Sequence, residues 1–430
     1  MFTSVKKRSY SALPFILVLI TLLVYFPVIG HQLQTLWDDQ WMITNFYTEG
    51  GISIENTTTI FGETFEGQYS PINQLMYTFI YYVGGYNPVG FHLYSLLLHL
   101  ANVVMIYFVL RKALINGRRI DDIYACKIAF FVAFLFAVHP INVEAVAWVS
   151  ASKVLLYVFF TLLCFIGYLH YVYSRKWIFY IFSCVMFVFS CGSKEQAVIL
   201  PTSLFLLDIL LSRNMKKKGV WLEKLPFILF ALLVGLFTLS IQDVSLIAER
   251  AGYPLWQRLI FASYSLVEYL VKLIIPVNLM YLYPFPMVIG EDLPLRFYIY
   301  PVVLLVAAIG LFVSRKQWII CFGVLFFVFN IALTLHIAPM SRYTLVADRY
   351  VYLSSVGIFL IGVWYAVAYI EKQTKKKRAF IYLLVACYFL YVGIYAHQRS
   401  KVWYDTDTLK KEIRVLIEER DDIESVEPIE

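Results

Sequence analysis

The stretch SALPFILVLITLLVYFPVIG, residues 11–30, decides the fold class. An α-helix rises about 1.5 Å per residue, so about 20 apolar residues cross a hydrocarbon core of about 30 Å. Runs of similar length recur along almost the whole chain, which is 60% hydrophobic and 15% charged with a mean hydropathy of +0.70. Each span in lipid must satisfy its own backbone hydrogen bonds. The sequence therefore predicts an all-α, polytopic membrane protein.

The distribution of charge predicts how the spans are oriented. Basic clusters fall at every second gap between the apolar runs, and the positive-inside rule places such clusters, and with them the N-terminus, in the cytoplasm. The gap at residues 31–70 carries six acidic residues and no Lys or Arg, so it is predicted to be external. Residues 11–30 follow a basic segment as a leader would, but PVIGH offers no small-residue cleavage site, so we interpret the run as a retained span.

This alternation predicts about eleven spans and an external C-terminus. The expected spans are 11–30, 90–111, 127–140, 153–172, 177–191, 197–211, 226–241, 297–313, 317–336, 350–370 and 379–396. Residues 71–84 and 258–275 do not fit the alternation and are predicted to be interfacial or re-entrant helices. The expected organisation is a membrane domain over 1–396, including a first external loop over 31–89, and a short polar tail over 397–430.

Polar residues outside the basic clusters gather at the predicted external ends of the spans. They include Asp38, Asp39, Tyr69, His92, His139, Glu144, Lys194, Glu195, Arg342, Asp348 and Arg349. Ionisable groups near lipid are costly unless they are paired or functional, so their convergence predicts one external site. Plainer alternatives are solvated loop charge for the two aspartates, an ordinary span end for His139 and a self-neutralising ion pair for Lys194 and Glu195.

Two arginines at these external ends suggest what the site binds. Arg342 and Arg349 could contact lipid headgroups nonspecifically, but they defy the positive-inside rule, which favours a specific anionic partner. If that partner is a polyprenyl-phosphate sugar, Arg349, Arg342 or Lys194 can stabilise the leaving phosphate, and no general acid is needed.

The acceptor hydroxyl does need a base. Either Asp38 or Asp39, held between Trp37 and Trp41, suits that task. A single displacement that is assisted by one base inverts the configuration at the anomeric carbon. The adjacent carboxylates could instead share a divalent cation, whose remaining ligands the sequence does not identify.

Several motifs occur in an order that is similar to a known family. They are Trp37-Asp38-Asp39-Gln40, Tyr69-Ser70-Pro71-Ile72, Gly90-Phe91-His92, His139-Pro140-Ile141-Asn142-Val143-Glu144, Ser193-Lys194-Glu195-Gln196 and Asp348-Arg349-Tyr350-Val351-Tyr352. This set resembles the membrane half of transmembrane and tetratricopeptide repeat-containing proteins, which are similar to the protein O-mannosyltransferases of the GT-C superfamily. The resemblance covers roughly residues 10–405.

The resemblance implies a GT-C-type bundle, a polyprenyl-phosphate sugar donor, typically of mannose, and transfer on the extracytoplasmic face. It gives catalysis to the acidic pair, Asp38 and Asp39, and places the other motifs, including Tyr352, around the cavity for donor and acceptor. Two features depart from the family pattern. Ser70 stands where the family commonly has arginine, which leaves more phosphate contact to Arg342 or Arg349, and the tail over 397–430 holds no tetratricopeptide array.

The expected partners are the lipid-linked donor, membrane lipids and a protein, glycan or lipid acceptor, with no nucleic acid. The expected location is a bacterial inner membrane, with the site and the C-terminus periplasmic, or alternatively the endoplasmic reticulum. A rival hypothesis is a lipid or solute transporter, suggested by the many spans and by Glu268 within apolar sequence. A scaffold that has lost activity is a third hypothesis, which the intact acidic pair disfavours.

Overall fold

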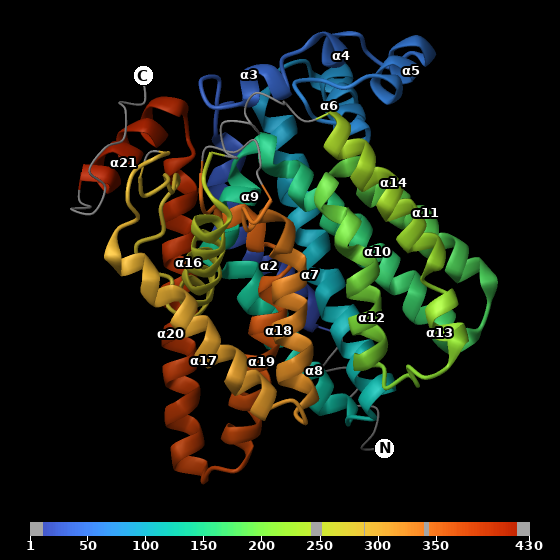
Figure 1. Cartoon of the computed structure of the whole chain (residues 1–430), viewed down its shortest axis with the longest axis vertical. Coiled ribbons are helices and arrows are strands. Elements are labelled where there is room, and N and C mark those ends of the chain that lie inside the picture. Colours follow the sequence, from blue (N-terminus) through green and yellow to red (C-terminus); the bar gives the residue numbers. More distant parts are fainter. Residues whose placement is uncertain (1–11, 242–251, 288, 339–343, 419–430) are drawn as a thin grey trace.

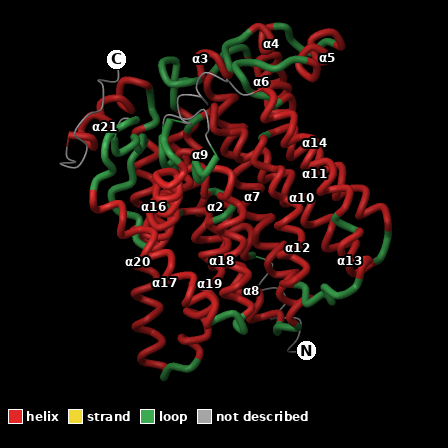
Figure 2. The backbone as a smooth tube through the Cα atoms, viewed as in Figure 1, coloured by secondary structure: helices red, strands yellow, loops and turns green. Residues whose placement is uncertain are grey.

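The computed structural model describes residues 12–241, 252–287, 289–338 and 344–418. Within these ranges the chain is a helical bundle, and its β-structure is limited to two isolated bridges. Figure 1 shows the helices in chain order, and Figure 2 shows that loops gather mainly at the two ends of the bundle.

The helices have the following bounds. The first group is α2 Leu13–Tyr25, α3 Asp39–Met42, α4 Phe46–Glu49, α5 Ile54–Gly62, α6 Pro71–Gly84, α7 Pro88–Arg118, α8 Asp122–Val138, α9 Val143–Ala147, α10 Ser152–Ser174 and α11 Trp177–Ser193. The second group is α12 Leu200–Leu210, α13 Lys218–Leu222, α14 Leu225–Ile241, α16 Leu255–Ile274, α17 Ile299–Val313, α18 Trp318–Ile331, α19 Ser355–Glu371, α20 Lys375–Val402 and α21 Thr406–Glu418. Short 3₁₀ turns that matter below are η2 Pro140–Asn142, η3 Val149–Ala151, η4 Glu195–Ile199 and η7 Asp348–Val351.

The prediction of a multi-pass membrane protein is confirmed. Within the described residues, six helical segments are long and apolar enough to cross a membrane, and a seventh candidate is the pair formed by α8 and the η2–α9 segment, which bends by 54°. Shorter apolar helices cover Trp177–Ser193, Trp318–Thr334 and Ser355–Glu371. The number of eleven spans stays a prediction, although each expected span coincides with a helix. The two segments expected not to cross are also helical, as α6 and α16.

The bundle has a buried centre and a lipid-accessible periphery. In α10, 78% of the most apolar window is buried, compared with 56% in α7, because α10 packs against both α7 and α11. At the periphery the buried share falls to 11% in α14, 6% in α17 and 11% in α20. These three helices carry apolar side chains on nearly all sides, which is stable only in contact with lipid.

One end of the bundle carries the segments that form the site. Figure 1 shows α3 to α6, α9 and α21 at this end, and the turn between α19 and α20 at the other. We call it the loop-1 end, after residues 31–70. The last long helix continues beyond the expected boundary at residue 396 as far as Val402. The predicted polar tail contains the helix α21, whose Leu409 and Ile413 are buried.

A buried ionic network closes the opposite end around the start of α14. Lys224 directly precedes α14 and donates to Asp208 of α12, and both side chains are fully buried. Arg213 bonds both Asp208 and Glu223, with the Glu223 contact at 2.6 Å. Buried charges are stable only when paired and hydrogen-bonded, so the network fixes the end of α14 against α12.

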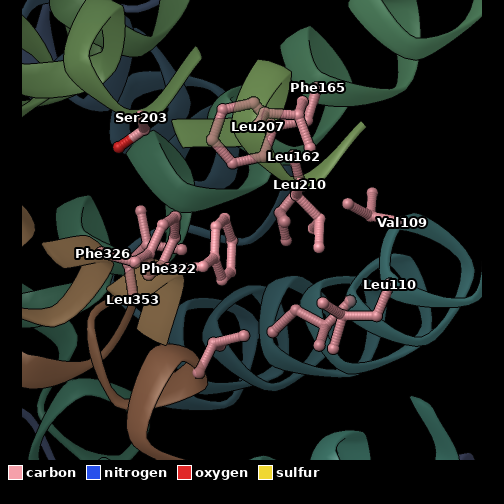
Figure 3. Close-up of a pocket in the computed structure, with 12 residues that line it drawn as sticks. Val109, Leu110, Leu162, Phe165, Ser203, Leu207, Leu210, Phe322, Phe326 and Leu353 are labelled. Atoms are coloured by element: carbon pink, nitrogen blue, oxygen red, sulfur yellow. The ribbon is translucent and has the colours of Figure 1, made fainter. Parts of the chain in front are cut away.

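A small cavity in the centre of the bundle is a packing feature and not a ligand site. It lies among side chains of α7, α10, α12 and α18, including Val109, Leu162, Leu207 and Phe326 (Figure 3), and its volume is about 30 Å³. The Ser203 hydroxyl on its wall is within 3.3 Å of the Asn330 side chain. A space of this size holds about one water molecule, which excludes a sugar or a lipid.

Substitution of Gly323 tests the close packing of α18 on α19. A Cβ atom at Gly323 would lie 2.5 Å from the carbonyl oxygen of Gly357. We expect Gly323→Ala to destabilise the protein by about 1–3 kcal/mol, since the helices must move apart. Gly310→Ala on α17 is the matched control, because nothing lies within 4 Å of a Cβ there. Thermal unfolding in detergent compares them, and equal midpoints for the two variants would contradict this packing.

Candidate functional site

Asp39 attaches the first loop to the bundle. One carboxylate oxygen accepts from the backbone N–H of Gln34 at 2.7 Å, and the other accepts from the backbone N–H of Ser150 at 3.0 Å and from the Ser150 hydroxyl. Burial, with the side chain only 1% exposed, raises the pKa of Asp39 to about 6, and the three donors partly offset that effect. The group is therefore ionised at neutral pH, and it holds loop 1 against η3.

Asp38, the neighbouring residue, remains partly accessible and interacts with Arg349. It is half-buried and accepts from the indole N–H of Trp41 at 3.1 Å. It also acts electrostatically on Arg349, which it helps to keep charged. Adjacent residues at the start of the short helix α3 thus have different surroundings, since Asp39 points into protein and Asp38 remains partly accessible beside a cation.

Arg349 is fixed in position by Glu144. The Glu144 carboxylate accepts from the Arg349 guanidinium and, at 2.8 Å, from the Arg349 backbone N–H. The guanidinium lies 5.1 Å from the ring centre of Trp148, and the Arg349 side chain is 18% exposed. Although burial opposes the charge, the Glu144 carboxylate raises the pKa of Arg349 above its usual range. Arg349 is therefore a fixed, permanently charged and partly accessible cation.

Arg349, Glu144 and Trp148 form what we call the Arg349 cluster. An apolar groove begins beside it. It has a volume of about 480 Å³ and lies between α14 on one side and η4, α12 and the 3₁₀ turn η6 (Ala332–Thr334) on the other. Tyr350, next to Arg349, contributes to its wall, as do Glu195 and Gln196 of η4. Lys194 is buried and donates to Glu195 at 3.2 Å. The groove thus connects the lipid-facing helix α14 with the loop-1 end.

Other residues of the predicted site lie in different surroundings. Asp348 is buried and accepts from Arg399 of α20 at 3.0 Å and from the Tyr283 hydroxyl at 3.1 Å. Tyr352 lies inside the bundle, where its hydroxyl is 2.7 Å from a His99 ring nitrogen and 3.3 Å from the Asn102 amide. These contacts give both side chains a packing role between helices.

The two histidines and Tyr69 are also separate from the Arg349 cluster. His92 is buried against His31, with ring centres 5.7 Å apart, and its Nε2 lies 3.3 Å from the Gln32 carbonyl. The His139 ring nitrogen accepts from the Ile141 N–H and caps η2. Tyr69 donates to the Phe61 carbonyl at 2.9 Å and touches Phe237 of α14 edge-on. Arg342 lies outside the described residues.

Sequence reasoning missed several residues that shape the site. Ser150 holds Asp39, Trp148 lies beside Arg349, and Lys153 donates to Gln68, two positions before Ser70. Ser150 and Trp148 directly follow the motif that contains Glu144, so a longer motif window would have included them. Arg399 could have been found by the criterion that singled out Arg349, since both are cations at span ends that the charge pattern predicts to be external.

The acidic pair does not form a prearranged metal site. Both Asp39 oxygens already accept hydrogen bonds from Gln34 and Ser150. Among the residues that the structure describes, no group of three or more His, Cys, Asp or Glu side chains could hold a metal ion. A divalent cation at Asp38 and Asp39 therefore stays a prediction from sequence, and no catalytic step is derived through it.

Comparison with solved structures identifies the fold. The oligosaccharyltransferase AglB of Archaeoglobus fulgidus superposes on 92% of this chain with a TM-score of 0.50, at 12% identity and over 56% of the AglB chain. The chain has a GT-C fold. One AglB structure is a complex with an inhibitory peptide and a dolichol-phosphate.

Sequence comparison confirms the predicted resemblance. Human protein O-mannosyl-transferase TMTC4 is 37% identical over 107 residues, which are 23% of this chain and 14% of TMTC4. Protein O-mannosyl-transferase Tmtc1 of Drosophila melanogaster is 26% identical over 144 residues, which are 34% of this chain and 16% of Tmtc1. The matches thus span about a sixth or less of these relatives. No family model matches the chain.

The pH dependence of stability tests the Asp39 attachment. Since the pKa of Asp39 in the folded protein is raised to about 6 from an ordinary value of 3.8, the folded state favours the protonated form. The stability that Asp39 contributes is then greatest below about pH 4, falls between pH 4 and 6, and is constant above. The asparagine side chain of Asp39→Asn does not titrate. The thermal unfolding midpoint of wild type minus that of the variant should therefore decrease as the pH rises from about 4 to about 6. An increase over the same range would contradict the assignment.

Proposed function

We propose that this chain is an inverting glycosyltransferase that moves a hexose, with mannose as the first candidate, from a polyprenyl-phosphate donor to an acceptor hydroxyl at the loop-1 end. The observation that carries the proposal is the position of Arg349 next to Tyr350, which lines the groove, together with the electrostatic interaction of Asp38 with Arg349. A lipid-phosphate sugar needs an apolar channel for its tail, a cation for its phosphate and a base near its anomeric carbon. The site offers all three at one end of the bundle.

Arg349 is the proposed phosphate ligand. Glu144 holds one guanidinium nitrogen, and the planar fork can present its other nitrogen to a phosphate oxygen. When the bond between the anomeric carbon and the phosphate oxygen breaks, the electron pair leaves with the phosphate, and the fixed positive charge stabilises it. Lys194 and Arg342 remain proposed further phosphate contacts, and Lys194 directly precedes Glu195 and Gln196, which line the groove.

Asp38 is the proposed base, and Asp39 is a positioning residue. Asp38 is partly accessible, whereas the Asp39 oxygens are engaged with Gln34 and Ser150. In the proposed step the oxygen of the acceptor hydroxyl attacks the anomeric carbon on the side opposite the phosphate. Asp38 removes the proton of that hydroxyl at the same time. One displacement of this kind inverts the configuration.

The acceptor is proposed to be a protein, with glycan or lipid hydroxyls as alternatives. The names of the TMTC relatives and the peptide bound to AglB support a protein acceptor. The proposed membrane is the bacterial inner membrane with the site on its periplasmic side, with the endoplasmic reticulum as the alternative. The transporter hypothesis is weaker, because Glu268 pairs with Lys272 at 3.5 Å and Asp208 with Lys224.

Substitution of Asp38 tests the base. We expect Asp38→Asn to lower product formation roughly 10²- to 10⁴-fold, the usual contribution of a general base, with little change in thermal stability. Intact-mass analysis of exported proteins, glycans and lipids would compare cells that lack the gene with cells that express wild type or variant. A hexose-sized addition should require wild type, and polyprenyl-phosphate sugar should accumulate with the variant.

The matched control is Asp407→Asn, an exposed aspartate of α21 at the same end of the bundle. It should leave the product at the wild-type level. If Asp38→Asn also makes the product at that level, Asp38 is not the base.

A further inference from the structure

The amide of Gln196 is an unusual feature of the groove. Gln196 lines the groove wall and is 5% exposed, yet neither its carboxamide oxygen nor its nitrogen has a hydrogen-bond partner within the described residues. Buried polar side chains in native proteins nearly always have partners, and an exception needs an explanation. A ligand group that enters the groove beside Gln196 would provide one.

The three threonine hydroxyls of the groove are satisfied within the protein. Thr202 donates to the Ile199 carbonyl at 2.6 Å, Thr238 to the Val234 carbonyl at 2.8 Å and Thr334 to the Ile331 carbonyl at 2.8 Å. Each therefore uses its only proton on its own helix or turn. Gln196 differs from these threonines because neither its amide nitrogen nor its amide oxygen has a partner within the described residues.

The position of Gln196 shows which part of a lipid it would meet. It follows Lys194 and Glu195 in η4, and Tyr350, adjacent to Arg349, lines the same groove. The apolar side chains of α14, such as Leu232, Leu236 and Leu239, form much of the opposite wall. Gln196 thus lies near the boundary between the apolar groove and the charged residues Glu195 and Arg349, which is where the proposed function places the headgroup of the donor.

We propose that Gln196 recognises the sugar-phosphate headgroup and favours the loaded donor over the spent lipid phosphate. This inference rests on the proposed function. The amide nitrogen donates to a phosphate oxygen, and the amide oxygen accepts from a hydroxyl of the sugar. A bare phosphate is mostly the dianion at neutral pH, which supplies only acceptors. It therefore leaves the amide oxygen unpaired, whereas the glycosylated lipid satisfies both atoms.

Direct binding of two lipids to purified protein in nanodiscs tests the proposal. The probes are polyprenyl phosphate and mannosyl phosphoryl polyprenol, and binding is measured by thermophoresis. Wild type should bind the mannosylated lipid more tightly. In Gln196→Leu we expect that preference to fall about tenfold, in line with the loss of a hydrogen bond at a buried site. Gln196→Glu should weaken the binding of both lipids, because its charge repels phosphate.

A stability measurement separates recognition from a structural role. Gln196→Leu removes a buried amide without a partner, so the lipid-free variant should unfold at the wild-type temperature or above it. Thr202→Val is the matched control, since its hydroxyl is already bonded within the protein, and it should keep the preference between the two lipids.

Two outcomes separate the role of Gln196 from the proposed function. If wild type binds and transfers but Gln196→Leu keeps the full preference for the mannosylated lipid, the role of Gln196 is overturned and the proposed function stands. If wild type binds neither lipid and transfers no sugar, the proposed function fails, and the inference on Gln196 fails with it.

Discussion

The site depends on the attachment of loop 1 through Asp39. A carboxylate this deeply buried is tolerable only because Gln34 and Ser150 supply donors to both of its oxygens. The same bonds fix the backbone that carries Asp38, so the accessible carboxylate is placed by its inaccessible neighbour. Adjacent aspartates therefore serve different physical purposes, and the two cannot exchange roles without rebuilding η3.

Much of the fold could be predicted from the sequence because hydropathy and length decide what crosses lipid. The helices α6 and α16 were also predicted in nearly their observed positions, as segments that break the alternation of charge. The end of α20 was harder to predict. Polar residues after residue 396 resemble a solvated tail, yet Arg399 is buried because it meets Asp348 and the carbonyls of Leu279 and Met280. That compensation comes from residues distant in sequence.

For the site, the sequence predicted the collection of polar residues but not their grouping. Glu144 and Arg349 are 205 positions apart, and nothing in either motif says that they pair with each other. Asp348 and Arg349 are neighbours in the chain, but one faces α20 and the other faces Glu144 and Trp148. Pairing of this kind depends on tertiary packing, so a motif identifies a region more reliably than it identifies a role.

The exposure of α14 has a consequence for how a lipid would be selected. One side of this helix faces the bilayer and another lines the groove. A lipid tail that enters laterally from the bilayer therefore exchanges a hydrocarbon environment for a similarly apolar protein surface. Since lipid tails are as apolar as the side chains that would replace them, this exchange gains little free energy from the hydrophobic effect. The apolar part of the groove would then bind the tails of different long lipids with nearly equal affinity. Discrimination among them has to come from the few ångströms at its polar end.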